Sequence, residues 1–174
     1  MDADEKRFRR AVRKAVRDHV KEHKEAPPLT LWCSEGRNPR RPLSARVGAA
    51  HDAAGVRSYM VQQIRLHKPA WVAVGRGIHV PGDEMGVLEA TTLFALVFVS
   101  TSAIEAVMTE IVAGDMGAWR EAPEVAGVSR EEALAGEGGR GGAASTWTFV
   151  QQALRTVARE RDGLGPRGAV ELDG

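Results

Sequence analysis

Residues 49–66 read AAHDAAGVRSYMVQQIRL, and the interpretation of the whole chain depends on this stretch. With its flanks it has a helical pattern over residues 44–68, which Gly55 interrupts and Pro69 ends. Glycine tolerates the positive φ that a tight turn between two short helices needs. We therefore expect two helices that meet at Gly55. The second helix packs inward through three apolar residues, Val56, Val61 and Ile64.

This pattern resembles the helix-turn-helix of bacterial DNA-binding proteins, with Ala54, Gly55 and Val56 as its turn. The resemblance implies that the second helix enters a major groove. His51 departs from the family pattern, in which a small residue lies under the turn. The exposed face suits base recognition, because Arg pairs with guanine and Gln with adenine, but it also suits an ordinary solvated helix. The residues on this face are Arg57, Ser58, Tyr59, Gln62 and Gln63.

The segment after Pro69 extends the resemblance. Residues 70–80, AWVAVGRGIHV, place two short β-prone runs on either side of Gly75-Arg76-Gly77. A helix-turn-helix followed by such a hairpin is similar to the winged-helix variant, over residues 44–82. Arg76 then lies at the tip of the wing, where it can contact a phosphate or the minor groove. A plain surface hairpin with a solvated arginine remains the alternative.

The charge is divided unevenly along the chain, although the net charge is only +1. Residues 1–82 carry 17 Lys and Arg against 8 Asp and Glu, whereas residues 83–174 carry 7 against 15. Such polarity indicates an anionic partner for the first half, or two halves that attract each other within or between subunits. With 43% hydrophobic and 27% charged residues, the 174-residue chain is not a wholly disordered protein.

The first half contains two further sources of positive charge. Residues 4–24 have apolar side chains at helical spacing, and Lys and Arg cover much of the rest of the predicted helix. Residues 29–33, LTLWC, predict a short strand, and the following SEGRNPRRP predicts an exposed basic loop. We expect the helix and four arginines around this loop to contact DNA phosphates. The arginines are Arg37, Arg40, Arg41 and Arg46.

The second half is expected to be mainly helical. An uncharged run extends from Ala90 to Ile104, and its continuous hydrophobicity predicts burial on all sides. LFALVFV at 93–99 has the composition of a strand, but the absence of a turn signal before residue 90 favours helix over 84–113. We assign homo-oligomerisation to this region. Residues 144–162 predict an amphipathic helix, capped at Ser145 or Thr146 and ended by Gly163.

These elements predict a mainly α fold with a small β-hairpin, which is an α+β arrangement of a winged helix-turn-helix and a helical association domain. The expected regions are a basic DNA-binding domain at 1–82, an apolar-cored association domain at 83–135, a Gly-rich linker at 136–143, and a C-terminal helix with a frayed tail at 144–174.

Enzyme chemistry has scattered candidates and no constellation of residues. These are His51-Asp52, Cys33-Ser34 near Arg40, Asp83-Glu84 and the short Gly75-Arg76-Gly77. We expect no catalytic residues, no cofactor and no metal. The single cysteine excludes a disulfide framework within the chain, and no apolar run is long enough to span a membrane. A cytoplasmic location is therefore expected.

The sequence thus predicts a sequence-specific protein that binds double-stranded DNA, acting as a dimeric transcriptional regulator. The alternative is a DNA-packaging or assembly subunit of the phage type, which would form a larger oligomer. A small enzyme with an unrecognised site is the third reading.

Overall fold

The computed structural model describes residues 1–47, 53–86, 89–127 and 144–163. Its centre is a seven-stranded antiparallel sheet with the strand order β2-β1-β3-β4-β5-β6, and β7 also pairs with β5. The strands are β1 (Thr30–Glu35), β2 (Asn38–Arg46), β3 (Val72–Val80), β4 (Thr91–Val99), β5 (Ile104–Val112), β6 (Asp115–Met116) and β7 (Arg120–Glu121). The fold is therefore α+β around a large sheet, and the predicted winged helix-turn-helix architecture is wrong.

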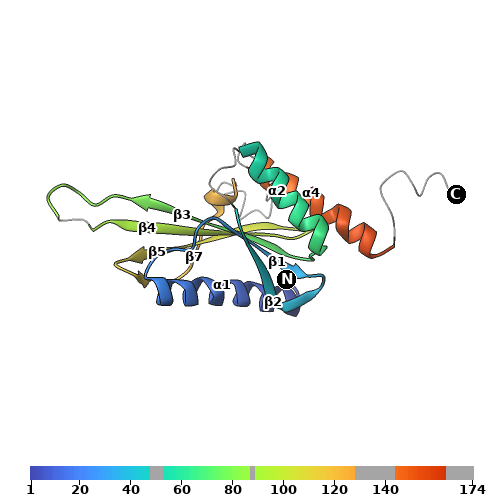
Figure 1. Cartoon of the computed structure of the whole chain (residues 1–174), viewed down its shortest axis with the longest axis horizontal. Coiled ribbons are helices and arrows are strands. Elements are labelled where there is room, and N and C mark those ends of the chain that lie inside the picture. Colours follow the sequence, from blue (N-terminus) through green and yellow to red (C-terminus); the bar gives the residue numbers. More distant parts are fainter. Residues whose placement is uncertain (48–52, 87–88, 128–143, 164–174) are drawn as a thin grey trace.

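Helices cover both faces of this sheet (Figure 1). Helix α1 (Ala3–His23) lies on one face, which we call the α1 face. Helices α2 (Ala53–His67) and α4 (Ala144–Arg161) lie together on the other, the α2/α4 face. A short 3-10 helix, η1 (Pro123–Ala126), follows β7. The result is a three-layer arrangement with a separate apolar core on each face.

The predicted N-terminal helix is confirmed. The side chain of Asp2 caps α1 by accepting a 2.7 Å hydrogen bond from the backbone N–H of Glu5. One side of the helix is buried against aromatic residues of the sheet, and its apolar residues recur every four positions. They are Phe8, Val12, Val16 and Val20. Lys24 adopts the left-handed conformation and closes the helix.

The predicted helix-turn-helix does not form. Residues 44–46, assigned to the first helix, belong to strand β2, and α2 begins at Ala53. Ala54, Gly55 and Val56 therefore lie inside one continuous helix. Gly55 is not among the glycines with positive φ. His51 lies outside the described residues. A glycine in a helical pattern costs only about 1 kcal/mol, so packing of α2 on the sheet can override it.

The predicted wing is also wrong, because Gly75-Arg76-Gly77 lies inside strand β3 and makes no turn. β3 pairs with β4 from Val72 opposite Val99 to Val80 opposite Thr91. Gly75 serves a close approach: a Cβ there would lie 2.7 Å from both Phe94 Cζ and Trp32 Cζ3. The glycine allows these two buried aromatic rings to pack over the strand.

Residues 84–113 were predicted to be helical, but they contain the strands β4 and β5. In the turn between these strands, the Ser100 N–H donates to the Ala103 carbonyl oxygen and the Ser100 Oγ accepts from the Ala103 N–H. The uncharged run is buried because β4 is a central strand. Phe94, Leu96 and Phe98 point into the core of the α1 face, and Val97 and Val99 point into the core of the α2/α4 face. A strand buried on both faces has no polar alternation.

The remaining predictions are divided. The strand at 29–33 is confirmed as β1, and the C-terminal helix as α4, with Gly163 at φ 75° after its end. The predicted cap is wrong, because α4 begins at Ala144 and contains both Ser145 and Thr146. The predicted basic loop after β1 is in fact the edge strand β2. The boundary predicted near residue 83 falls between β3 and β4, which pair along their whole length. The linker at 136–143 lies outside the described residues.

We expect Gly75→Ala to destabilise the chain by about 1–3 kcal/mol, because the added methyl group overpacks two buried aromatic rings. Chemical denaturation followed by tryptophan fluorescence measures this loss. The control is Gly77→Ala on the same strand, where the nearest atom to a new Cβ is Thr92 Cγ2 at 3.1 Å. Equal stability of Gly75→Ala and the wild-type chain would show that Gly75 is not a packing glycine.

Candidate functional site

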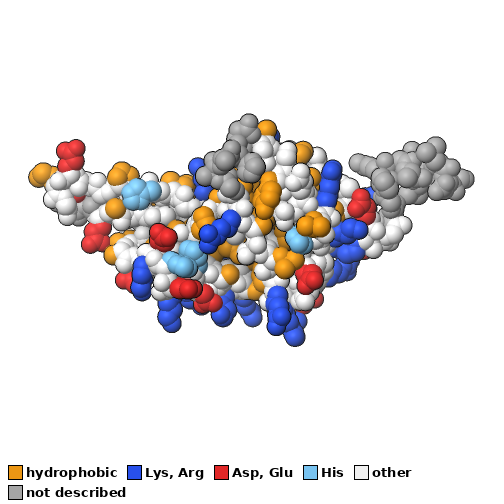
Figure 2. Space-filling model, in the orientation of Figure 1, with side chains coloured by type: hydrophobic (Ala, Val, Ile, Leu, Met, Phe, Trp, Pro, Cys, Tyr) orange, Lys and Arg blue, Asp and Glu red, His pale blue; other side chains and the backbone are white. Residues whose placement is uncertain are grey.

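The most distinctive surface of the molecule is one flank of α1, which carries a row of cations. Its members follow one another at spacings of three or four residues, so they share one side of the helix. They are Lys6, Arg10, Arg13, Arg17, Lys21 and Lys24, and we call them the basic row. Eighteen residues separate its ends, which corresponds to about 27 Å along a helix. Figure 2 shows Lys and Arg side chains projecting along the lower edge of the molecule, where α1 lies in Figure 1.

Within the described residues, the six side chains of the basic row form no salt bridge. The other cations of α1 behave differently. Arg7 pairs with Asp4 at 3.0 Å, and Lys14 pairs with Asp18 at 2.6 Å. The positive charge of α1 is therefore neutralised on its outer side and left uncompensated on the flank that faces β5 and β6.

Arg9 holds this flank in place. Its guanidinium is buried, bonds to Glu5 on the same helix at 2.8 Å, and bonds to Glu105 on β5. The guanidinium also lies over the Phe98 ring, 4.9 Å from the ring centroid. These contacts tie α1 to β4 and β5, so the basic row has a fixed position beside the edge of the sheet.

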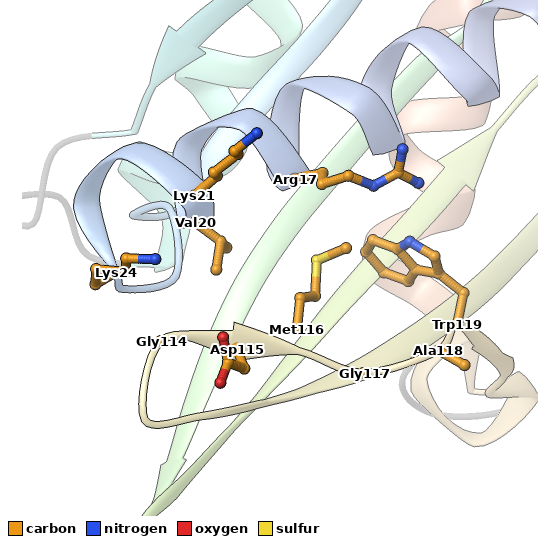
Figure 3. Close-up of a pocket in the computed structure, with 10 residues that line it drawn as sticks. All are labelled: Arg17, Val20, Lys21, Lys24, Gly114, Asp115, Met116, Gly117, Ala118 and Trp119. Carbon is orange, nitrogen blue, oxygen red and sulfur yellow. The ribbon is translucent and has the colours of Figure 1, made fainter.

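A groove of about 370 Å³ lies between the C-terminal half of α1 and residues 114–119 (Figure 3). Arg17, Val20, Lys21 and Lys24 form one wall. Figure 3 shows Met116 and Trp119 rising from the other wall toward α1, with the Arg17 guanidinium across from Trp119. Gly114, at φ 80°, forms a tight turn next to Lys24. A Cβ at this position would lie only 3.0 Å from Lys24 Cβ, so glycine allows this wall to approach the end of α1. Asp115 is the one acidic lining residue.

Arg13 connects the groove to the rest of the basic row. Its guanidinium lies 5.8 Å from the Trp119 ring and 5.9 Å from the Phe98 ring. Burial, and secondarily the neighbouring charge of Arg9, lower the pKa of Arg13. Two donors at this place, Arg13 Nε and Trp119 Nε1, are buried without a protein acceptor among the described residues. The surroundings of Arg13 thus favour an added negative charge.

The five residues predicted for base recognition lie on α2, on the opposite face of the sheet from the basic row. Arg57, Ser58 and Gln62 are exposed there. Tyr59 is half-buried and packs against the core of the α2/α4 face. Gln63 is half-buried, with Oε1 3.3 Å from His67 Nε2. These residues do not form a recognition helix of a helix-turn-helix, because no such motif exists in this fold.

The predicted phosphate-binding arginines are dispersed as well. Arg37 lies in the turn between β1 and β2 and pairs with Asp162 at 3.4 Å. Arg40, Arg41 and Arg46 lie along β2, and Arg76 is exposed on β3. The pKa of His19 on α1 is lowered by burial first, then by His23 and then by the charge of Arg46. Arg46 therefore acts on the α1 face of the sheet. The structure does not gather the predicted arginines into one surface with α2.

The groove residues Met116 and Trp119 were missed by sequence reasoning. The spacing of the basic row was readable in the sequence, and the first helix was indeed predicted to contact phosphates. The contribution of residues 114–119 was not readable, since nothing local indicates that they return to α1 across β5.

The enzyme candidates form no site among the described residues. Burial raises the pKa of the Cys33 thiol to about 12, which makes it a poor nucleophile. The Ser34 hydroxyl donates to the backbone of Gly36 and accepts from Ala70, so it is structural. Asp83 and Glu84 are exposed after β3, and His51-Asp52 lies outside the described residues. No three His, Cys, Asp or Glu side chains of the described chain are placed to hold a metal ion.

Comparisons with protein-family models, with curated proteins and with solved structures find no match to this chain. Among the described residues, no helix has the length and apolar character needed to cross a membrane.

We expect Arg9→Ala to cost about 3–5 kcal/mol of stability, because it leaves the Glu5 carboxylate enclosed without its cation. The control is Arg7→Ala on the same helix, which removes an exposed pair and is expected to cost less than about 1 kcal/mol. Urea denaturation of both variants measures the difference. Similar losses in the two variants would contradict the anchoring role of Arg9.

Proposed function

We propose that this protein binds double-stranded DNA through its phosphates, along the basic row of α1. The observation that carries the proposal is the uncompensated charge of six cations on one flank of a fixed helix. A helix that needs charge only for solubility mixes signs on its surface. Lys6 moreover lies in the first turn of α1, where the helix dipole disfavours a cation.

The geometry of the row suits an extended polyanion. Its length of about 27 Å corresponds to roughly eight base pairs of a duplex at 3.4 Å each. Lys and Arg contact phosphates as charges, and they position a protein on DNA without reading its sequence. The row contains no Asn or Gln to read adenine. We therefore propose that binding depends little on the DNA sequence. Such binding is sufficient for a packaging or assembly subunit, whereas a transcriptional regulator must also recognise a sequence.

The first test measures binding of a mixed-sequence duplex by fluorescence anisotropy over a range of salt concentrations. Each neutralised phosphate contributes about −0.9 to the slope of log K against log salt, so six contacts give a slope of about −5. We expect Arg10→Gln/Arg17→Gln/Lys21→Gln to reduce the steepness of this slope by about half. The matched control removes the same charge from other surfaces, by Arg41→Gln/Arg57→Gln/Arg65→Gln, and is expected to leave the slope nearly unchanged.

A second variant gives a change of opposite sign. Asp115 places a negative charge in the groove beside the basic row. Asp115→Asn removes its repulsion of phosphates, and we expect it to tighten DNA binding at low salt about two- to fivefold. Absence of duplex binding by the wild-type chain at low salt would overturn the proposal, as would equal losses in the α1 variant and its matched control. Single-stranded DNA and an RNA duplex serve as competitors that define the preferred polyanion.

A further inference from the structure

The groove beside α1 adds an apolar and aromatic wall to the basic row. Met116 and Trp119 rise from this wall toward the helix (Figure 3). Three cations of the basic row line the opposite wall, and they are Arg17, Lys21 and Lys24. The volume of about 370 Å³ falls within the range of about 300–1,000 Å³ that is usual for small-molecule sites. The basic row therefore continues from an exposed helix surface at Lys6 and Arg10 into a groove of mixed chemistry.

Trp119 differs from the other aromatic residues of the α1 face. It is only half-buried, whereas the aromatic rings of the core on this face are at most 9% exposed. A buried indole N–H normally has a hydrogen-bond acceptor, but Trp119 Nε1 is buried with none among the described residues. Arg17 lies across the groove from it (Figure 3), and a guanidinium has no acceptor to offer. The place next to Trp119 therefore lacks an acceptor group.

These features match the two parts of a nucleotide. Lys and Arg side chains bind a phosphate, and an aromatic side chain stacks on a base, because every base has a π face. Oxygen atoms of the phosphate or the base can accept from the indole N–H. Asp115 is acidic and lies on the wall opposite α1. We therefore expect the phosphate at the α1 wall and the base against Met116 and Trp119.

We propose that the groove binds an unpaired nucleotide of the DNA that lies along the basic row. Within a duplex, the neighbouring base pairs cover both faces of a base, so only an unpaired base can stack on Trp119. The preferred ligand is then a duplex with a single-stranded tail, whose paired part contacts the row at Lys6 and Arg10 and whose tail enters the groove. This proposal rests on the DNA-binding function proposed above.

The test compares three DNAs by fluorescence anisotropy. They are a blunt duplex, the same duplex with a short tail of thymidines, and the same duplex with an equally long tail of abasic sites. The two tails carry the same phosphates, and only the first carries bases. We expect the thymidine tail to bind about fivefold or more tightly than the abasic tail, with the same dependence on salt. Tails at the 3′ and at the 5′ ends are compared, and the polarity that binds more tightly is used for the variants.

Two tryptophan variants locate the stacking site. Trp119→Leu is expected to abolish the difference between the two tails and to leave the affinity for the abasic tail and its salt dependence unchanged, since Trp119 carries no charge. The matched control is Trp147→Leu, which replaces a half-buried tryptophan of α4 on the opposite face of the sheet. It is expected to retain the difference. Thermal melting followed by circular dichroism shows whether both variants fold.

Three results would overturn the proposal. The first is equal binding of the two tails by the wild-type chain, which needs no variant to fold. The second is the same loss of preference in both tryptophan variants. The third is free dAMP that binds as tightly as the tailed duplex, which would make the groove a site for a free nucleotide. If none of the three DNAs binds at low salt, the DNA-binding function itself is wrong, so the two failures are distinguishable.

Discussion

The structure depends on the burial of β4 on both of its faces. Alternate residues of this strand point into separate cores, with aromatic rings toward α1 and valines toward α2 and α4. The close approach at Gly75 follows from the same constraint, because the large rings of Phe94 and Trp32 need space above the neighbouring strand. The helices on the two faces are therefore connected mechanically through one central strand.

The polar surfaces are organised by the same sheet. Because α1 is held against the sheet, the side of the helix on which each cation lies is fixed, and the buried Arg9 strengthens this attachment. The uneven distribution of charge along the sequence places positive and negative charge on different surfaces of the folded molecule. One flank of α1 is cationic without partners, whereas the connection between β3 and β4 carries exposed carboxylates such as Glu84 and Glu89.

Sequence reasoning correctly predicted the elements whose pattern is local. α1 and α4 have apolar faces with helical spacing, and β1 has the composition of a strand. It failed for β4 and β5, because continuous hydrophobicity has no period that distinguishes a doubly buried strand from a buried helix. It failed at Gly75 and Gly55, because a glycine marks a turn or a close approach equally well in the sequence. For the candidate site, the basic row could be predicted from the sequence. The wall formed by Met116 and Trp119 could not, because it exists only when the folded chain brings residues 114–119 back to α1.

The attachment of α1 also has a consequence for the order of folding. The partners of its buried face include Trp32 and Trp71 as well as residues of β4 and β5, and Glu105 is 96 residues further along the chain than Arg9. At a synthesis rate of about 5–20 residues per second, roughly 5–20 seconds pass between the synthesis of Arg9 and that of Glu105. During that time only the strands already synthesised, β1 to β3, can cover its apolar side, with Phe8 and three valines. The first element to be synthesised is thus among the last whose contacts are completed.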